Sequence, residues 1–286
     1  MFGKRPRYPS IDRVLDLLAQ QIDYFGLNHV CFWDDIFTFK RQRIIDLCDA
    51  IARRGLDLVW GCQTRVDCVD EDLIQRMARA GCAFIEYGVE TPTQELSHSL
   101  GKRLSVERIQ NAIEMTDRAG ITMQINLLVG SPGETESTMK AAIDFGRNVL
   151  AQFHALPCYW TATALPGTVM YDEVVREHGY VEFRNTSPTA DVLDHATGYL
   201  PRDLEHSAFS TSLRDAWTQD ESRVKEWFVS NRLLQAALQY SGLNLDGYLE
   251  KVFPGRIGDF VDSTFFTTSF DRAAYWDRRS SVGSPP

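Results

Sequence analysis

The chain has 286 residues, a formal net charge of −9, and 44% hydrophobic and 24% charged residues, a composition typical of a folded globular protein. The acidic balance argues against nucleic acid as a ligand, because proteins that bind it usually present a basic face. No apolar run reaches the ~18–20 residues of a membrane span, and the first residues lack the apolar core of a signal peptide. We therefore expect a cytoplasmic protein that does not contact a membrane.

Helical and strand patterns alternate along the first 178 residues. Apolar residues at helical spacing predict helices over 11–22, 44–51, 73–80, 92–100, 109–116 and 139–149, with a short helix over 169–178. Between them, short apolar runs predict strands over 29–33, 58–62, 83–89, 121–129 and 155–163. Such alternation predicts parallel strands joined by right-handed crossovers. The sequence thus indicates an open, curved α/β sheet of five strands with helices on its outer face.

The alternation stops near Tyr180. We expect a core over 1–178, a partly helical extension over 179–277 and a disordered tail over 278–286. Within the extension, apolar residues from Val224 to Leu238 predict one amphipathic helix.

Six cysteines are present, and none forms a C-x2-C or C-x3-C-x2-C motif. Most lie in apolar stretches, where a reduced thiol behaves as a small hydrophobic side chain. We therefore predict core thiols and assign no metal ligand among Cys31, Cys48, Cys62, Cys68, Cys82 and Cys158.

Each predicted strand ends in polar or Gly/Pro residues, at the edge where parallel α/β folds bind their ligands. Side-chain alternation also places Glu86 with Glu90 and Gln124 with Asn126 on the inner face of the sheet. The sequence therefore predicts a polar, wet interior. The residues at the five strand ends are Asp34 and Asp35, Thr64 and Arg65, Glu90, Gly130 to Glu134, and Thr163 to Thr168.

Plainer interpretations of these residues stay open. Asp34 and Asp35 could cap a loop, and Arg65 could form a salt bridge with Glu90 or Asp34. Glu86 could pair with a lysine. The Gly130–Glu134 segment could be a turn before a helix.

Six segments carry a resemblance to a known family. They are FWDDIF (32–37), WGCQTRVD (60–67), AGC (80–82), YGVE (87–90), GSPGET (130–135) and LPGT (165–168). In this order and spacing they resemble the radical SAM superfamily, in particular the branch often fused to an upstream cobalamin-binding domain. The resemblance runs from residue 1 to about 178.

The resemblance implies a partial (β/α)6 barrel of the TIM type. Its first strand ends in a C-x3-C-x2-C loop that holds a 4Fe-4S cluster, and S-adenosyl-L-methionine (SAM) chelates the fourth iron. Reductive cleavage of SAM then gives a 5′-deoxyadenosyl radical, which attacks an unknown small-molecule substrate. This sequence lacks that loop and its strand, so we predict a fragment or a decayed relative that assembles no cluster by itself. We also expect the exposed edge of the 29–33 strand to cause self-association.

Residue roles follow from the same resemblance. Asp34 and Asp35 would contact the methionyl amine, Arg65 the methionyl carboxylate, and Glu90 the ribose or the amine. Asn126 would face the ribose, Gly130 would let the backbone approach, and the strand that ends at Thr163 would present backbone groups to adenine. Cobalamin would come from an upstream domain or a partner chain.

Two alternatives have different chemistry. One is a cluster-independent barrel enzyme that uses Glu90 and Asp35 as acid and base. The other is a non-catalytic remnant that binds the cofactor or a partner chain.

Overall fold

Five parallel strands form one sheet in the computed structural model, which describes residues 7–129, 131, 133–162, 167–169, 172, 176 and 221–242. The strands are β1 (His29–Phe32), β2 (Val59–Thr64), β3 (Cys82–Glu90), β4 (Thr122–Val129) and β5 (Ala155–Thr161). They lie side by side in chain order, and β1 does not pair with β5. The predicted open α/β sheet of five parallel strands is confirmed.

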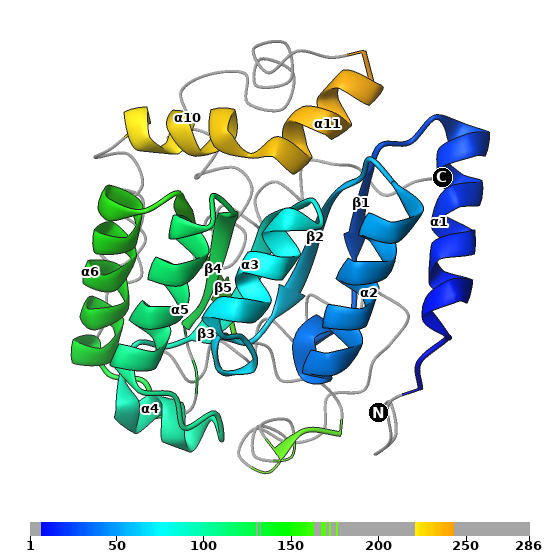
Figure 1. The fold of residues 1–286 in the computed structure, drawn as a ribbon. Helices are drawn as coiled ribbons and strands as arrows, with labels where there is room; N and C mark the ends of the chain where they lie inside the picture. The colour runs from blue at the N-terminus through cyan, green and yellow to red at the C-terminus, as the bar shows by residue number, and fades with distance from the viewer. Residues whose placement is uncertain are drawn as a thin grey trace, which may run out of the picture.

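Five of the first six α-helices cover one face of this sheet, and the fourth, α4 (Gln94–Ser99), lies at the end where the strands finish (Figure 1). The sheet presents its apolar side chains to the five covering helices; Ile85, Tyr87 and Val89 of β3 are fully buried, as is Ile125 of β4. Period-two alternation explains why the residues between them lie on the opposite, concave face. The helices are α1 (Ile11–Phe25), α2 (Arg41–Arg54), α3 (Glu71–Arg79), α4 (Gln94–Ser99), α5 (Val106–Arg118) and α6 (Glu136–Gln152).

Local signals in the sequence fix the ends of these helices. Ser10, Asp70 and Ser105 each accept a hydrogen bond from the backbone N–H three residues later, which caps α1, α3 and α5. Gly26 and Gly55 end α1 and α2 in the left-handed conformation that glycine adopts without strain.

The prediction of a single helix over 224–238 is wrong, because the segment is divided in two. Two helices form there, α10 (Glu221–Ser230) and α11 (Arg232–Tyr240), because Asn231 caps the second with its side chain. A short polar residue that binds nearby backbone competes with a continuous helix.

Helices α10 and α11 lie at the amino-terminal ends of the strands (Figure 1). The indole of Trp227 donates to the carbonyl of Met123 at 2.7 Å, and the Thr122 hydroxyl donates to the carbonyl of Ser230 at 3.1 Å. Met123 and Thr122 begin β4, so these bonds hold the pair of helices at the end of the sheet opposite to the strand carboxyl ends.

Several predicted segments lie outside the described residues. Of the extension expected over 179–277, only residues 221–242 are described, and the tail over 278–286 is not. The short helix expected over 169–178 is described at residues 169, 172 and 176 alone.

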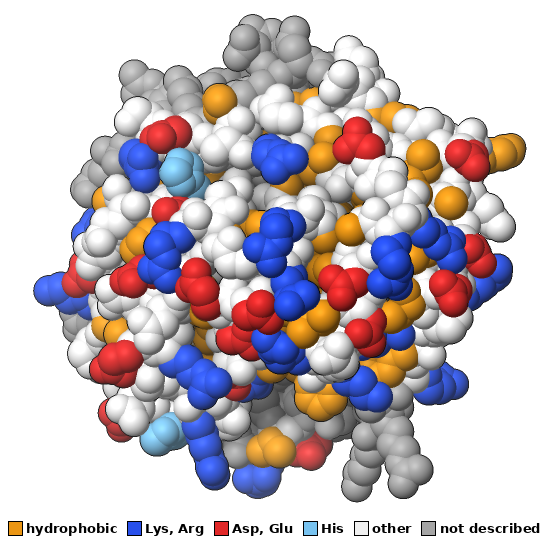
Figure 2. All heavy atoms as spheres, in the orientation of Figure 1, with side chains coloured by type: hydrophobic (Ala, Val, Ile, Leu, Met, Phe, Trp, Pro, Cys, Tyr) orange, Lys and Arg blue, Asp and Glu red, His pale blue; other side chains and the backbone are white. Residues whose placement is uncertain are grey.

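Acidic and basic side chains intermix over the helix-covered face of the sheet (Figure 2). Some of them are paired; Arg41 contacts Asp70 and Asp72, and Arg118 contacts Glu71. Within the described ranges, no helix combines the length and the apolar character needed to cross a membrane.

Candidate functional site

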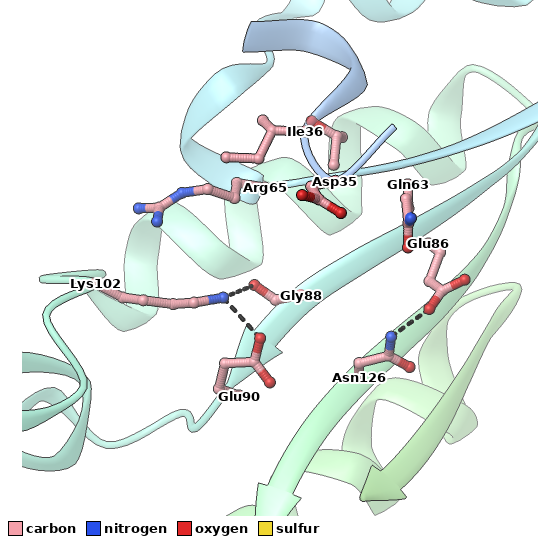
Figure 3. Close-up of a pocket in the computed structure, with 10 residues that line it drawn as sticks. Asp35, Ile36, Gln63, Arg65, Glu86, Gly88, Glu90, Lys102 and Asn126 are labelled. Carbon is pink, nitrogen blue, oxygen red and sulfur yellow. Dashed lines mark hydrogen bonds and ion pairs between the residues drawn. The ribbon is translucent and has the colours of Figure 1, made fainter. Parts of the chain in front are cut away.

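A cavity of about 280 Å³ opens at the carboxyl ends of the strands. Figure 3 shows its lining residues, which come from β2 and β3, from β4, and from the loops after β1 and α4. We call it the carboxyl-end cavity. The residues that line it are Asp35, Ile36, Gln63, Thr64, Arg65, Glu86, Gly88, Glu90, Lys102 and Asn126.

Glu90, the last residue of β3, has an unusual backbone. Its φ of 68° lies in the left-handed region, where side chains other than glycine are strained by about 1–3 kcal/mol. The pairing of β3 with β4 also shifts register between Gly88 and Glu90. This bulge turns the Glu90 carboxylate back over Gly88 and into the cavity.

Lys102 holds that carboxylate in place. Its Nζ donates to Oε1 of Glu90 at 2.7 Å and to the carbonyl oxygen of Gly88 at 3.0 Å (Figure 3). Both charged side chains are 19% exposed, so the pair is shielded from solvent more than a surface salt bridge is.

The turn after α4 positions Lys102. The carbonyl of Ser97 accepts from the backbone N–H groups of Lys102 and Arg103, and the Ser97 hydroxyl accepts from the N–H of Leu104. Gly101 and Arg103 have positive φ values of 72° and 52°. Lys102 was not predicted from the sequence, because it lies in a turn between two helices and not at the end of a strand.

A second set of polar side chains lies deeper on the concave face. Asn126 donates from Nδ2 to Oε1 of Glu86, and its Oδ1 accepts from Gln124 at 2.9 Å and from the indole of Trp160 at 3.0 Å. The inward orientation predicted for Glu86, Glu90 and Asn126 is confirmed by the lining of the cavity.

Arg65 lines the cavity, yet it already has an anionic partner. Its Nε and Nη2 donate to the two carboxylate oxygens of Asp67 at 2.8 and 2.7 Å. This guanidinium lowers the pKa of Asp67, and Asp67 in turn raises the pKa of Arg65. The pair uses the Nε–Nη2 edge, so a ligand carboxylate would have to approach the Nη1 edge.

The predicted site residues divide into three groups. Asp35, Arg65, Glu90 and Asn126 converge on the cavity as expected. Asp34 is exposed and does not line it. Gly130 and Thr163 lie outside the described residues. The cofactor-binding role of each residue stays a prediction.

The cysteines in the described part of the chain do not fit an iron–sulfur cluster. Cys48, Cys62 and Cys82 are buried in the hydrophobic core. Cys31 and Cys158 come from the two outermost strands of the sheet. Among the described residues, no three His, Cys, Asp or Glu side chains are arranged to hold a metal ion.

Comparison with known proteins decides the family. The model of the Radical SAM superfamily matches residues 1–146, slightly more than half of the 286 residues. The chain belongs to the radical SAM superfamily. Members of this superfamily are enzymes that use SAM and a 4Fe-4S cluster, so the family resemblance seen in the sequence is confirmed.

One similar protein is the uncharacterized methyltransferase PH0819 of Pyrococcus horikoshii. It is 27% identical over 174 residues, which cover 61% of this chain and 37% of the relative. The chain therefore matches well under half of the length of that protein.

Two solved structures of radical SAM enzymes show the same fold. The methyltransferase TsrM from Kitasatospora setae, with cobalamin and a [4Fe-4S] cluster bound, is 20% identical with a TM-score of 0.53, over 59% of this chain and 32% of that one. The cobalamin-dependent enzyme OxsB, with aqua-cobalamin and SAM bound, is 14% identical with a TM-score of 0.54, over 94% and 45% of the two chains.

Proposed function

We propose that the carboxyl-end cavity binds SAM and that this chain forms part of a radical SAM methyltransferase. The observation that carries the proposal is the chemistry of the cavity lining. Three carboxylates, from Asp35, Glu86 and Glu90, face two cations, from Lys102 and Arg65, of which Arg65 is paired with Asp67. SAM carries a sulfonium and an ammonium group, and a cavity with excess acidic charge stabilises them.

The predicted ligands that line the cavity have matching roles, and Asp34, which does not line it, has none. Asp35 supplies a carboxylate for the methionyl ammonium, and Glu90 supplies one for the ammonium or the ribose hydroxyls. The Nη1 edge of Arg65 donates to the methionyl carboxylate. Asn126 borders the ribose. Gly130 and Thr163 would complete the site from the ends of β4 and β5.

The proposal does not include binding of a 4Fe-4S cluster by the described residues. In the superfamily, SAM and the 4Fe-4S cluster together supply radical chemistry. Because the described cysteines do not fit a cluster, we assign this chain only the binding and orientation of SAM. The likeness to TsrM and OxsB, both solved with cobalamin bound, supports a cobalamin-associated reaction of a small-molecule substrate. An upstream cobalamin-binding domain or a partner chain stays a prediction.

The alternative of a cluster-independent acid–base enzyme has less support. In that enzyme Glu90 and Asp35 would exchange protons with a substrate. The Lys102 ammonium instead holds Oε1 of Glu90 at 2.7 Å, so this oxygen is already engaged. A catalytic carboxylate must be free to reach the substrate proton at hydrogen-bond distance.

Calorimetry on the full chain tests the proposal. We expect SAM to bind several-fold more tightly than S-adenosylhomocysteine, which lacks the sulfonium charge. Glu90→Gln should weaken SAM binding about tenfold, the effect of about 1.4 kcal/mol. Glu95→Gln, on the exposed face of α4, is the matched control and should bind as the parent does. Equal affinity for the two ligands, or no binding of SAM at millimolar concentration, would contradict the proposal.

A further inference from the structure

Glu86 lies deeper in the carboxyl-end cavity than Glu90. The two residues share the concave face of β3 and are four positions apart. Because the Glu90 carboxylate turns back to the level of Gly88, Glu86 lies about two residues, or about 7 Å, nearer the amino end of the strand. The two carboxylates therefore border different levels of the same interior.

The side chain of Asn126 fixes how Glu86 is presented. Because Oδ1 of Asn126 accepts from Gln124 and from Trp160, its amide nitrogen is turned toward Glu86 (Figure 3). That bond occupies Oε1 of Glu86. Among the described residues no donor contacts the second oxygen, which is open to a ligand.

Unlike Glu90 and Asp67, Glu86 has no counter-ion within the described part of the chain; Asp35 has none either, but it is exposed, whereas Glu86 is partly buried. Glu90 has Lys102, and Asp67 has Arg65. The strand neighbours of Glu86 in register are Gln63 on β2 and Gln124 on β4, which are neutral.

The two thiols that interact electrostatically with Glu86, those of Cys31 and Cys158, supply no positive charge. Burial, and after it the Glu86 carboxylate, raises the pKa of Cys31 and of Cys158. A partly buried carboxylate without a cation is costly, and such groups occur where a ligand supplies the missing charge.

We propose that Glu86 binds a protonated amine of the substrate, so that the substrate class is a small molecule with a primary or secondary ammonium group. This inference rests on the proposed function, in which SAM occupies the upper level beside Glu90. The ammonium donates to the open oxygen of Glu86, and Asn126 holds the carboxylate still.

Saturation-transfer NMR with three probes of matched size tests the inference on the full chain, with and without saturating SAM. The probes are butylammonium, butanol and butyrate. We expect signal from butylammonium alone, reduced at least tenfold by Glu86→Gln and unchanged by Glu95→Gln. Glu86→Asp, which keeps the charge, should retain part of the signal.

A second variant avoids removing Glu86. Gln63→Lys places an ammonium beside it on the neighbouring strand and should displace butylammonium. Butylammonium binding that survives Gln63→Lys or Glu86→Gln would overturn the inference. So would equal signals from the three probes, or Glu86→Gln weakening SAM as much as butylammonium. Failure of SAM to bind the parent protein would contradict the proposed function instead, and the SAM-free measurement would still decide the role of Glu86.

Discussion

The ammonium of Lys102 lies 2.7 Å from the carboxylate of Glu90, across 12 residues of chain. One turn after α4 thereby fixes the final residue of β3 in a left-handed conformation. The bond links the turn after α4 to the cavity. The attraction between Lys102 and Glu90 offsets the cost of the strained backbone at Glu90.

Lys102→Met should lower SAM affinity about tenfold, because the Glu90 carboxylate loses the group that orients it. Breaking a half-buried charged hydrogen bond should also cost about 1–3 kcal/mol of unfolding free energy. Calorimetry and urea denaturation measure the two effects. Lys140→Met, on the exposed face of α6, is the control. Unchanged SAM affinity in Lys102→Met would show that the pair serves stability alone.

Glu90→Gly should be more stable than Glu90→Ala by about 1 kcal/mol, since only glycine adopts a φ of 68° without strain. Both variants lack the carboxylate, so the comparison isolates the backbone. At an ordinary strand position alanine is more stable than glycine. At Tyr87 we therefore expect Tyr87→Ala to be more stable than Tyr87→Gly. Urea midpoints give the difference, and a more stable alanine variant at residue 90 would refute the strain argument.

Gly61→Ala should destabilise the protein by about 1–3 kcal/mol. A Cβ at Gly61 would lie 2.7 Å from Cδ2 of Leu233 and 3.1 Å from Phe84, so the Leu233 side chain would have to rotate or α11 would have to move. The double variant Gly61→Ala, Leu233→Ala should lose less unfolding free energy than the two single variants lose in sum, because Leu233→Ala removes the clash. Thermal unfolding of the four proteins provides the cycle. Strict additivity would mean that α11 does not pack on β2.

Asp67→Asn should reduce the acid sensitivity of the fold. The Arg65 guanidinium lowers the folded-state pKa of Asp67, so the pair stabilises the protein fully above the ordinary value of about 3.9. That stabilisation is lost as pH falls through the lowered value. Because the side chains of Arg65 and Asp67 are 26% and 24% exposed, solvent screens the pair and its contribution amounts to about 1 kcal/mol at most. Denaturation at pH 7 and pH 3 measures it, with the exposed Asp23→Asn as control. An equal pH dependence in both variants and the parent would contradict this assignment.

The sequence predicted the sheet well because period and polarity agree there. Alternation along β3 puts Ile85, Tyr87 and Val89 against the helices, and the chain order of strands follows from the crossovers. It failed at Asn231, where one side chain divides an apolar stripe that helical spacing alone cannot divide.

The site was predicted only in part. Strand ends identified Asp35, Arg65 and Glu90, since parallel strands bring their carboxyl ends together, and side-chain alternation identified Asn126. The lysine that fixes Glu90 comes from a turn whose path depends on the buried Ser97. Which carboxylate pairs with Arg65 depends on the side-chain rotamers of Arg65 and Asp67. The spacing of the strands predicts neither the position of Lys102 nor this pair.

The indole of Trp160 is an intrinsic fluorophore beside the carboxyl-end cavity. It is 40% exposed and bonded to the same amide that holds Glu86, whereas Trp60 and Trp227 are buried in the core. A ligand that binds Glu86 should therefore change the emission of Trp160. The chain has six tryptophans, so the difference between the parent and Trp160→Phe isolates this signal and reports occupancy without any added dye.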